Sequence, residues 1–164
     1  MAKTWKDNEI SLDPLKDQTV AVIGYGIQGD AQANNMKDSG LNVIVGLKEG
    51  GKSWTKAKND GHQVMSVSEA CKKADIIHVL IPDMIQSQVY NDDIGPNLSE
   101  GKALSFSHAA AIHWKWITAP DNVDIIMVAP KGPGSKVRET YLENFGTPAI
   151  VAVEEVWEYA RPIR

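Results

Sequence analysis

Short apolar runs alternate along this chain with longer segments in which apolar and polar residues are mixed. The apolar runs are rich in β-branched residues and predict strands at residues 19–24, 41–46, 63–65, 76–82, 103–108, 124–129 and 148–153. The mixed segments between them predict helices at residues 27–39, 53–59, 66–74, 84–90 and 133–144. Because strands and helices alternate, the sequence predicts an α/β fold with a doubly wound parallel sheet.

The run at residues 76–82 is almost continuously apolar, which is typical of a central parallel strand covered on both faces. His78 lies inside this run, and we interpret it as a core histidine rather than a ligand. The single cysteine, Cys71, lies in a predicted helix with no metal-ligand spacing around it, so we interpret it as a packing residue. His62 follows a glycine in a turn, and the sequence assigns it no role.

The first strand runs directly into residues 24–29, GYGIQG, where three glycines are spaced G-x-G-x-x-G. In a strand–turn–helix setting, Gly24 permits the turn, Gly26 lets a pyrophosphate approach the backbone, and Gly29 lets the helix pack close to the strand. The N–H groups at the helix start then face the anion. The motif favours a Rossmann-type dinucleotide-binding domain over the alternative of a plain glycine turn.

The loop after the second strand bears on the choice of dinucleotide. An NAD-binding domain usually has an Asp or Glu at the end of this strand, where it binds the ribose 2′-hydroxyl, and this chain has none there. Instead the loop carries Lys48, Lys52 and Ser53, two cations and a hydroxyl that suit a 2′-phosphate and favour NADP. Glu49 opposes a phosphate and loop lysines are often plain surface charge, so NADH use stays open.

Ligands of such sheets lie outside the carboxyl ends of the strands. Further candidates at these ends are Pro82, Asp83, Met84, Ile85 and Gln86, then His108, and then residues 131–134. His108 is the candidate for proton transfer, because imidazole donates or accepts a proton near neutral pH. The alternative is a histidine that only caps a loop. Trp114 and Trp116 are interpreted as core or partner-surface aromatics, and His113 as a packing residue.

Composition narrows the class of protein further. With 164 residues, 43% of them hydrophobic, the chain has the size of one globular domain and no room for a second. Its net charge of -4 argues against non-specific nucleic-acid binding. No apolar run reaches the ~18 residues of a membrane span and no signal peptide opens the chain, so we expect no membrane insertion and a cytoplasmic location.

From about residue 17 to residue 153 the chain resembles the N-terminal domain of the ketol-acid reductoisomerase family. The most specific of the motifs that carry this resemblance is VAPKGPG at residues 128–134. The others are VIGYG at 22–26 with Gln28 and Gly29, AQA at 31–33, DSG at 38–40, VIVGL at 43–47, SW at 53–54, LIPD at 80–83, PNL at 96–98 and SH at 107–108.

The resemblance implies an NADP-dependent enzyme of branched-chain amino-acid biosynthesis, the route to isoleucine and valine. Such an enzyme rearranges 2-acetolactate or 2-aceto-2-hydroxybutyrate in a magnesium-dependent alkyl shift and then reduces the product with NADPH. His108 and Lys131 match the family's active-site residues. The implied cofactor contacts are Tyr25, Gly26, Ile27 and Gln28 for the pyrophosphate, Lys48 and Ser53 for the 2′-phosphate, Asp83, Met84, Ile85 and Gln86 for the adenosine side, and Gly134 for the nicotinamide side.

The chain also departs from the family pattern. Ile27 stands where the family has a small residue, Asp30 where it often has His or Arg, and three alanines follow His108 in place of Gly-Phe-Asn. Residues 154–164 form an atypical tail, for which a short amphipathic helix and a disordered segment are equally good interpretations. The family's helical C-terminal domain, whose acidic residues bind two magnesium ions, has no counterpart in the sequence.

We therefore expect residues 1–153 to form an NADP-binding domain that is incomplete for catalysis alone, with magnesium bound only when the helical domain is present. The expected partners are the small-molecule substrate of the full enzyme and either a second copy of the chain or a separate helical half. Two other functions remain open. One is a non-catalytic nucleotide-sensing or assembly module, and the other is a different NADP-dependent oxidoreductase that uses His108 on another substrate.

Overall fold

Seven strands form a single sheet in the order β3-β2-β1-β4-β5-β6-β7 in the computed structural model, which describes residues 4–6 and 9–154. The first six strands are parallel to one another. Their order reverses between β1 and β4, where the chain crosses to the other half of the sheet. The strands are β1 (Thr19–Ile23), β2 (Asn42–Gly46), β3 (Gln63–Met65), β4 (Ile76–Val79), β5 (Ala103–Phe106), β6 (Asp124–Pro130) and β7 (Ala149–Val153).

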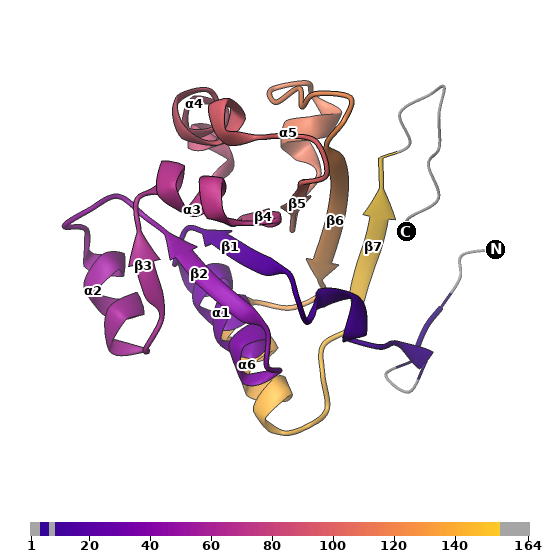
Figure 1. The fold of residues 1–164 in the computed structure, drawn as a ribbon. Coiled ribbons are helices and arrows are strands. Elements are labelled where there is room, and N and C mark those ends of the chain that lie inside the picture. Colours follow the sequence, from indigo (N-terminus) through magenta and orange to yellow (C-terminus); the bar gives the residue numbers. More distant parts are fainter. Residues whose placement is uncertain (1–3, 7–8, 155–164) are drawn as a thin grey trace.

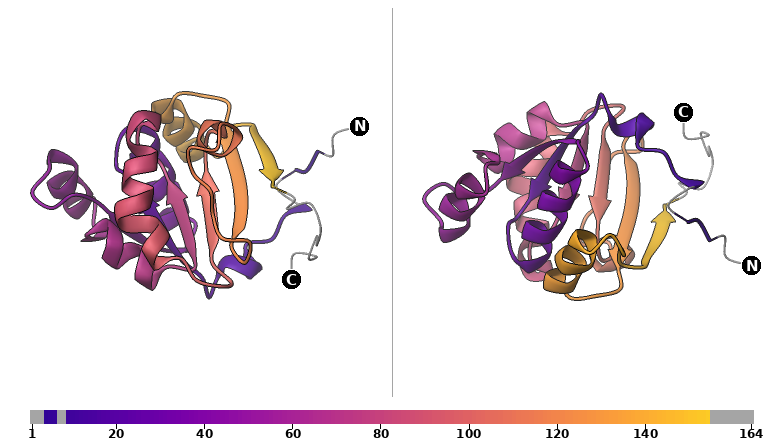
Figure 2. Two further views of the ribbon diagram at one scale, coloured as in Figure 1. Left: turned by 90° about the horizontal axis from the view of Figure 1, so that it is seen from above. Right: turned by 90° about the horizontal axis from the view of Figure 1, so that it is seen from below.

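Helices cover both faces of this sheet, as the alternating pattern predicts. Figure 1 and the two views of Figure 2 place α1 and α6 against one face and α3 and α4 against the other. The α-helices are α1 (Ile27–Asp38), α2 (Lys52–Asn59), α3 (Val67–Lys73), α4 (Asp83–Val89), α5 (Ala110–His113) and α6 (Gly134–Leu142). A π-helical turn at Tyr90–Ile94 extends α4, and 3₁₀ turns lie at Asp13–Leu15 and Gly95–Asn97.

The central strand β1 is buried on both sides because successive side chains of a strand point to opposite faces. Val20 and Val22 pack on the α1 side with Ala33 and Val45. Ala21 and Ile23 belong to the larger core on the α3 side. This second core also contains Cys71, which is fully buried, so the prediction that the cysteine is a packing residue is confirmed. His78 is likewise buried in β4, as predicted.

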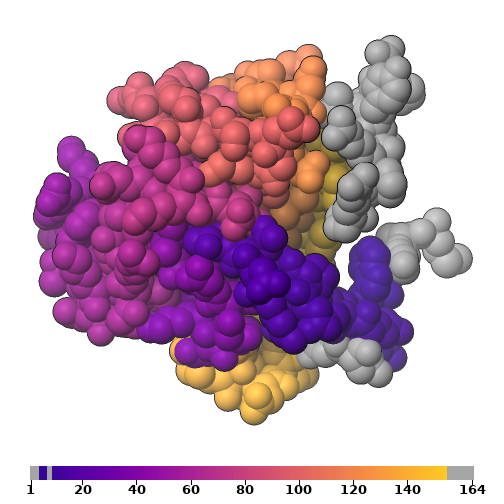
Figure 3. Space-filling view, viewed as in Figure 1, coloured from indigo at the N-terminus to yellow at the C-terminus, as the bar shows by residue number. Residues whose placement is uncertain are grey.

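Strand β7 differs from the sequence prediction because it runs antiparallel to β6, with Ala149 paired to Pro130. The connection that contains α6 leaves the carboxyl end of β6 and returns to the same end of the sheet, since the Lys131 N–H donates to the Pro148 carbonyl at 2.8 Å. For β7 to run parallel to β6, the connection would have to cross to the opposite end of the strands. Alternation of strands and helices does not specify the end of the sheet to which the chain returns. The space-filling view shows α6 and the chain after it at the lower border of the molecule (Figure 3).

Strand β1 ends one residue earlier than predicted, at Ile23, β4 three residues earlier, at Val79, and β5 two residues earlier, at Phe106. The residues that follow β4 and β5 include Leu80, Ile81, Ser107 and His108, which line the site described below. The prediction that His113 packs inside is wrong, because it lies exposed at the end of the one-turn helix α5. Trp114 and Trp116 are 64% and 47% exposed, which removes the core alternative for them.

The predicted tail falls almost entirely on residues 155–164, which lie outside the described residues. None of the helices within the described ranges combines the length and the apolar character that crossing a bilayer requires.

Candidate functional site

The glycine turn after β1 has the geometry that the glycine spacing predicts. Gly24 has a φ of 100°, and a Cβ there would lie 2.8 Å from the Leu80 carbonyl oxygen. A Cβ on Gly29 would lie 2.3 Å from the Gly24 carbonyl oxygen, so this glycine lets α1 pack against the turn. At Gly26, by contrast, a Cβ would meet nothing within 4 Å. The turn is therefore open at its second glycine, where a pyrophosphate can approach the backbone.

The start of α1 completes this cradle. Gly26 precedes the helix, and no side chain among the described residues caps its first turn. N–H groups of a first helical turn have no partner within the helix, so they suit an anion. Gly134 at the start of α6 lies against the same turn, since a Cβ there would lie 2.2 Å from the Ile27 carbonyl oxygen. The structure thus brings the predicted residues Ile27, Gly29 and Gly134 to one place.

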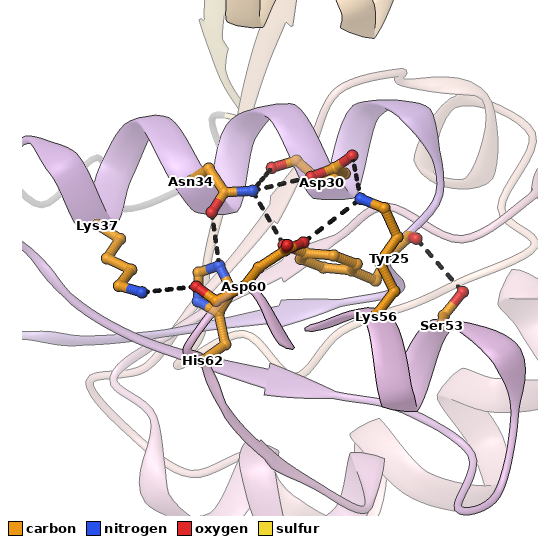
Figure 4. Close-up of polar contacts among 8 residues, drawn as sticks. All are labelled: Tyr25, Asp30, Asn34, Lys37, Ser53, Lys56, Asp60 and His62. Atoms are coloured by element: carbon orange, nitrogen blue, oxygen red, sulfur yellow. Dashed lines mark hydrogen bonds and ion pairs between the residues drawn. The ribbon is translucent and has the colours of Figure 1, made fainter. Parts of the chain in front are cut away.

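A polar cluster around Tyr25 joins the glycine turn to α2 (Figure 4). The Tyr25 ring is buried, its hydroxyl donates to Asp60 at 2.9 Å, and it accepts from the Asn34 amide at 2.9 Å. Burial, together with the Asp60 carboxylate, raises the pKa of this phenol. Lys56 lies 5.0 Å from the centre of the ring. The cluster holds the Tyr25 side chain inside the protein, so its backbone is the part that can meet a ligand.

Asp30, one of the departures from the family pattern, belongs to this cluster. Its carboxylate pairs with Lys56 and accepts from the Asn34 amide at 2.8 Å (Figure 4). The lysine offsets the negative charge near the cradle, and an acid in the first turn of a helix also suits the helix dipole.

The sequence pattern did not identify Asn34, Lys56 or Asp60 as members of this cluster, and it gave His62 no role. His62 is buried, its Nε2 lies 3.0 Å from Asn34 Oδ1, and burial lowers the pKa of its imidazole. Its ring meets that of Tyr25 edge-on at 5.5 Å. The signal in the sequence was the spacing of four residues between Asp30 and Asn34, which puts both on one face of α1.

The loop between β2 and α2 places its candidate residues beside the turn. The Ser53 hydroxyl donates to the Tyr25 carbonyl at 3.3 Å, and Lys48 is exposed in the preceding loop. Helix α2 begins at Lys52 with no acidic residue in its first turn. The end of β2 therefore carries positive charge and a hydroxyl, which is an environment suited to a phosphate.

A pocket of about 200 Å³ opens where β4 and β5 end. Among its lining residues are Gln28, Asp83, Gln86, Ser107 and His108. Gln86 is 4% exposed, and its amide donates to Asp83 and to the Ile81 carbonyl, both at 3.0 Å. Its buried Oε1 has no partner among the described residues. An unpaired buried acceptor is unfavourable, so this oxygen is a point of strain in the wall of the pocket.

The other predicted residues of this segment lie at the exposed start of α4. Pro82 precedes the helix, and Met84 and Ile85 are 91% and 43% exposed. None of the three lines the pocket of Gln86. Their contact with a cofactor stays a prediction.

His108 lies at the mouth of the pocket with a defined ring orientation. Its Nδ1 accepts the Ala110 N–H at 3.2 Å and lies 3.8 Å from a carboxylate oxygen of Asp83. A ring nitrogen that accepts a hydrogen bond carries no proton, so the neutral imidazole has its proton on Nε2. The ring can donate from Nε2, and the protonated form has a carboxylate beside it.

A second pocket of about 340 Å³ shares Ser107 and His108 with the first and also has Lys131 and Trp114 in its lining. The two predicted active-site residues, His108 and Lys131, therefore line one cavity although they follow different strands. Across residues 4–6 and 9–154, no group of three or more His, Cys, Asp or Glu side chains is placed to hold a metal ion.

A family model, curated relatives and a solved structure all point to the same family. The family described as acetohydroxy acid isomeroreductase, NADPH-binding domain, matches residues 14–160. The chain is 83% identical over 155 residues to a ketol-acid reductoisomerase (NADP(+)) of Nitrosopumilus maritimus, covering 94% of this chain and 47% of the relative. It is 58% identical over 153 residues to the enzyme of the same name from Pyrococcus abyssi, covering 93% of this chain and 46% of that relative.

Among solved structures, an NADH-preferring ketol-acid reductoisomerase from an uncultured archean superposes with a TM-score of 0.87 at 49% identity, covering 91% of this chain and 46% of that chain. The chain thus spans about half the length of the curated relatives it matches. It belongs to the family of NADPH-binding N-terminal domains of ketol-acid reductoisomerase.

Proposed function

We propose that this chain is the part of a ketol-acid reductoisomerase that holds NADPH, in an enzyme that isomerises and reduces 2-acetolactate or 2-aceto-2-hydroxybutyrate. One observation carries the proposal: the glycine turn is open at Gly26 and closed at Gly24 and Gly29. A ligand that needs close backbone approach at the second glycine accounts for that difference, and a dinucleotide pyrophosphate is such a ligand.

Each candidate residue then has a proposed task. The backbone of Tyr25, Gly26, Ile27 and Gln28 meets the pyrophosphate, and the loop with Lys48 and Ser53 meets the 2′-phosphate. NADPH supplies a hydride when it is bound. Residues 83–86 and Gly134 flank the cofactor, and Asp83 and Gln86 line the pocket beside His108.

His108 and Lys131 are proposed to act on the substrate. His108 can donate the proton on Nε2, while the Ala110 N–H fixes the ring and Asp83 stands beside Nδ1. Lys131 adds a positive charge to the wall of the same cavity, which suits an anionic substrate. We assign magnesium binding and the rest of the active site to a helical domain outside these 164 residues, because the curated relatives are about twice as long as the matched segment.

We also propose that the protein works in the cytoplasm and that its face at α5 meets this helical domain or a second copy of the chain. The support is the exposure of Trp114 and Trp116, at 64% and 47%, next to the cavity of His108. Exposed aromatic residues at the mouth of a polar site are typical of a surface that a partner covers.

Cofactor choice tests the proposal directly. The wild-type chain should bind NADPH at least tenfold more tightly than NADH in a calorimetric titration. Lys48→Ala combined with Ser53→Asp should reverse this preference, because it removes a cation and adds a carboxylate where the 2′-phosphate is proposed to lie. Lys58→Ala serves as the matched control, since Lys58 lies in the last turn of α2 and its ammonium lies over the Trp54 ring. If the double variant lost affinity for NADPH and NADH equally, the proposal that Lys48 and Ser53 bind the 2′-phosphate would be contradicted.

Replacing His108 by alanine should separate binding from chemistry. We expect NADPH affinity to stay within about threefold, because the ring is exposed and outside the glycine turn. In an enzyme reconstituted with the helical domain of a relative, turnover of 2-acetolactate with magnesium should fall by about 10²–10⁴-fold, the usual contribution of a positioned acid or base. Steady-state turnover is the measurement, with the chain alone as the blank. Wild-type turnover in the variant, or high turnover by the chain alone, would refute these assignments.

A further inference from the structure

A buried chain of polar side chains lies between the sheet and α1, and two of its members, Gln28 and Ser107, line the first pocket. His78 on β4 lies 2.8 Å from the Ser105 hydroxyl on β5 through Nδ1 and 2.8 Å from Gln32 Oε1 on α1 through Nε2. The Gln32 amide nitrogen lies 3.0 Å from Gln28 Oε1 and 3.1 Å from the Ser107 hydroxyl. His78, Gln32 and Ser105 are all at least nine-tenths buried. Five side chains from three elements and the rim of β5 thus form one connected network.

A backbone carbonyl sets the direction of every hydrogen bond in this network. The Gln28 amide lies 3.0 Å from the Gly132 carbonyl oxygen, which can only accept, so the amide nitrogen points to it and Oε1 points to Gln32. Gln32 must then donate to Gln28, which turns its own Oε1 toward His78. His78 Nε2 therefore carries the ring proton, and Nδ1 accepts from the Ser105 hydroxyl.

This direction requires a neutral imidazole with one N–H. Burial lowers the pKa of His78 to about 4, so the ring is neutral at physiological pH. Each amide and hydroxyl in the chain then has a single orientation that satisfies its neighbours. A network of this kind is rigid, because no member can rotate without leaving a buried group unpaired.

The network ends at the groups that shape the second half of the site. Gln28 ties the glycine turn to Gly132, the residue after Lys131. Ser107 precedes His108, and its hydroxyl donates to the Val128 carbonyl of β6 at 2.9 Å. In a doubly wound sheet, the half that follows the crossover receives the second nucleotide of the dinucleotide. The network therefore braces the nicotinamide half, and none of the hydrogen bonds named above reaches the loop of Lys48.

We propose that His78, Gln32 and Ser105 are positioning residues for the nicotinamide half of the dinucleotide site, acting through Gln28 and Ser107. They hold the segment of residues 131–132 and the end of β5 at a fixed distance from the glycine turn before the cofactor arrives. Such preorganisation favours binding because less ordering is left to the complex. The inference rests on the proposed function, since it assumes that the site takes NADPH.

The test compares two ligands on a Gln32→Met variant of the full chain. Methionine keeps the length of glutamine and removes its hydrogen bonds. By calorimetric titration, the variant should bind NADPH at least tenfold more weakly than the wild type, while 2′,5′-ADP, which lacks the nicotinamide nucleotide, should bind within twofold of the wild type. Ser105→Ala, which removes only the hydroxyl that orients His78, should weaken NADPH binding about threefold and leave 2′,5′-ADP unaffected.

Lys102→Met is the control for a general loss of stability. Lys102 precedes β5 and donates to the Cys71, Lys72 and Ala74 carbonyls at the amino end of the strands, away from the site. Its loss should therefore lower the midpoint of thermal unfolding and change the affinity for neither NADPH nor 2′,5′-ADP. If Gln32→Met lost affinity for NADPH and 2′,5′-ADP equally, or lost affinity for neither, the inference would be overturned. If Gln32→Met does not fold, Ser105→Ala decides by the same comparison. If the wild-type chain binds neither ligand, the proposed function itself fails.

Discussion

A Gly29→Ala variant is expected to lose about 3 kcal/mol of unfolding free energy, whereas Gly26→Ala should unfold at nearly the wild-type midpoint and lose NADPH binding. The added methyl at Gly29 would lie 2.3 Å from the Gly24 carbonyl oxygen and 2.9 Å from its carbonyl carbon. Both atoms belong to the backbone of the turn, so no side-chain rotation relieves the clash. Helix α1 must move away from β1, and the packing of Ala33 against Val22 and Val45 loosens with it.

Gly26 makes the matched comparison because the chemical change is the same. Its φ of -81° is open to any residue, and a Cβ there meets no atom within 4 Å, so alanine should fit without strain. The methyl would stand in the space through which a pyrophosphate reaches the backbone N–H groups. We expect the NADPH affinity to fall at least thirtyfold, about 2 kcal/mol.

Urea unfolding of the two variants and NADPH titration of each measure this pair of effects. Gly50→Ala is a useful reference, since Gly50 has a positive φ of 74° but no neighbour within 4 Å, and it separates backbone strain from steric clash. Wild-type stability of Gly29→Ala would mean that α1 does not depend on close contact with the turn. Undiminished NADPH affinity of Gly26→Ala would remove the principal support for the proposed function.

The glycine turn illustrates what the sequence can predict. Its three glycines are close together in the chain, and each has a local physical reason, so their spacing alone was sufficient to predict the turn. The strands were predicted for a similar reason, since apolar runs and their length are local features. The direction of β7 was not predictable, because it depends on the end of the strands to which residues 143–148 return, and the sequence carries no local signal for that end.

The buried network shows the opposite case. His78 was identified as a core histidine from the apolar residues around it, and its burial confirms that interpretation. Its two partners, however, lie 27 and 46 residues away along the chain, on β5 and α1. Gln32 and Ser105 become its neighbours only through the strand order, which places β4 between β1 and β5. Contacts of this kind follow from topology and leave no spacing in the sequence.

His78 should also make the stability of the chain depend on pH in the range between 6.5 and 4. Its pKa falls from the ordinary 6.5 to about 4 because burial disfavours the charged ring. Between these values the unfolded chain binds more protons than the folded chain, so stability rises with pH. The contribution is complete above pH 6.5 and is lost as the pH falls toward 4. The shift corresponds to about 3 kcal/mol for this buried group.

Urea unfolding at pH 7, 6, 5 and 4.5 measures this dependence, and His78→Gln provides the comparison because glutamine stays neutral throughout. The variant should be less stable at pH 7 and lose less stability on acidification, so that the two curves converge near pH 4.5. The pKa of His62 is also lowered by burial, but that residue is present in both proteins and contributes equally to both curves. The carboxylates with lowered pKa, such as Asp60, likewise act on both proteins and mainly below this range. Parallel curves would show that the ring takes up its proton as readily in the folded chain as in the unfolded one, and they would contradict the neutral, singly protonated imidazole on which the direction of the network depends.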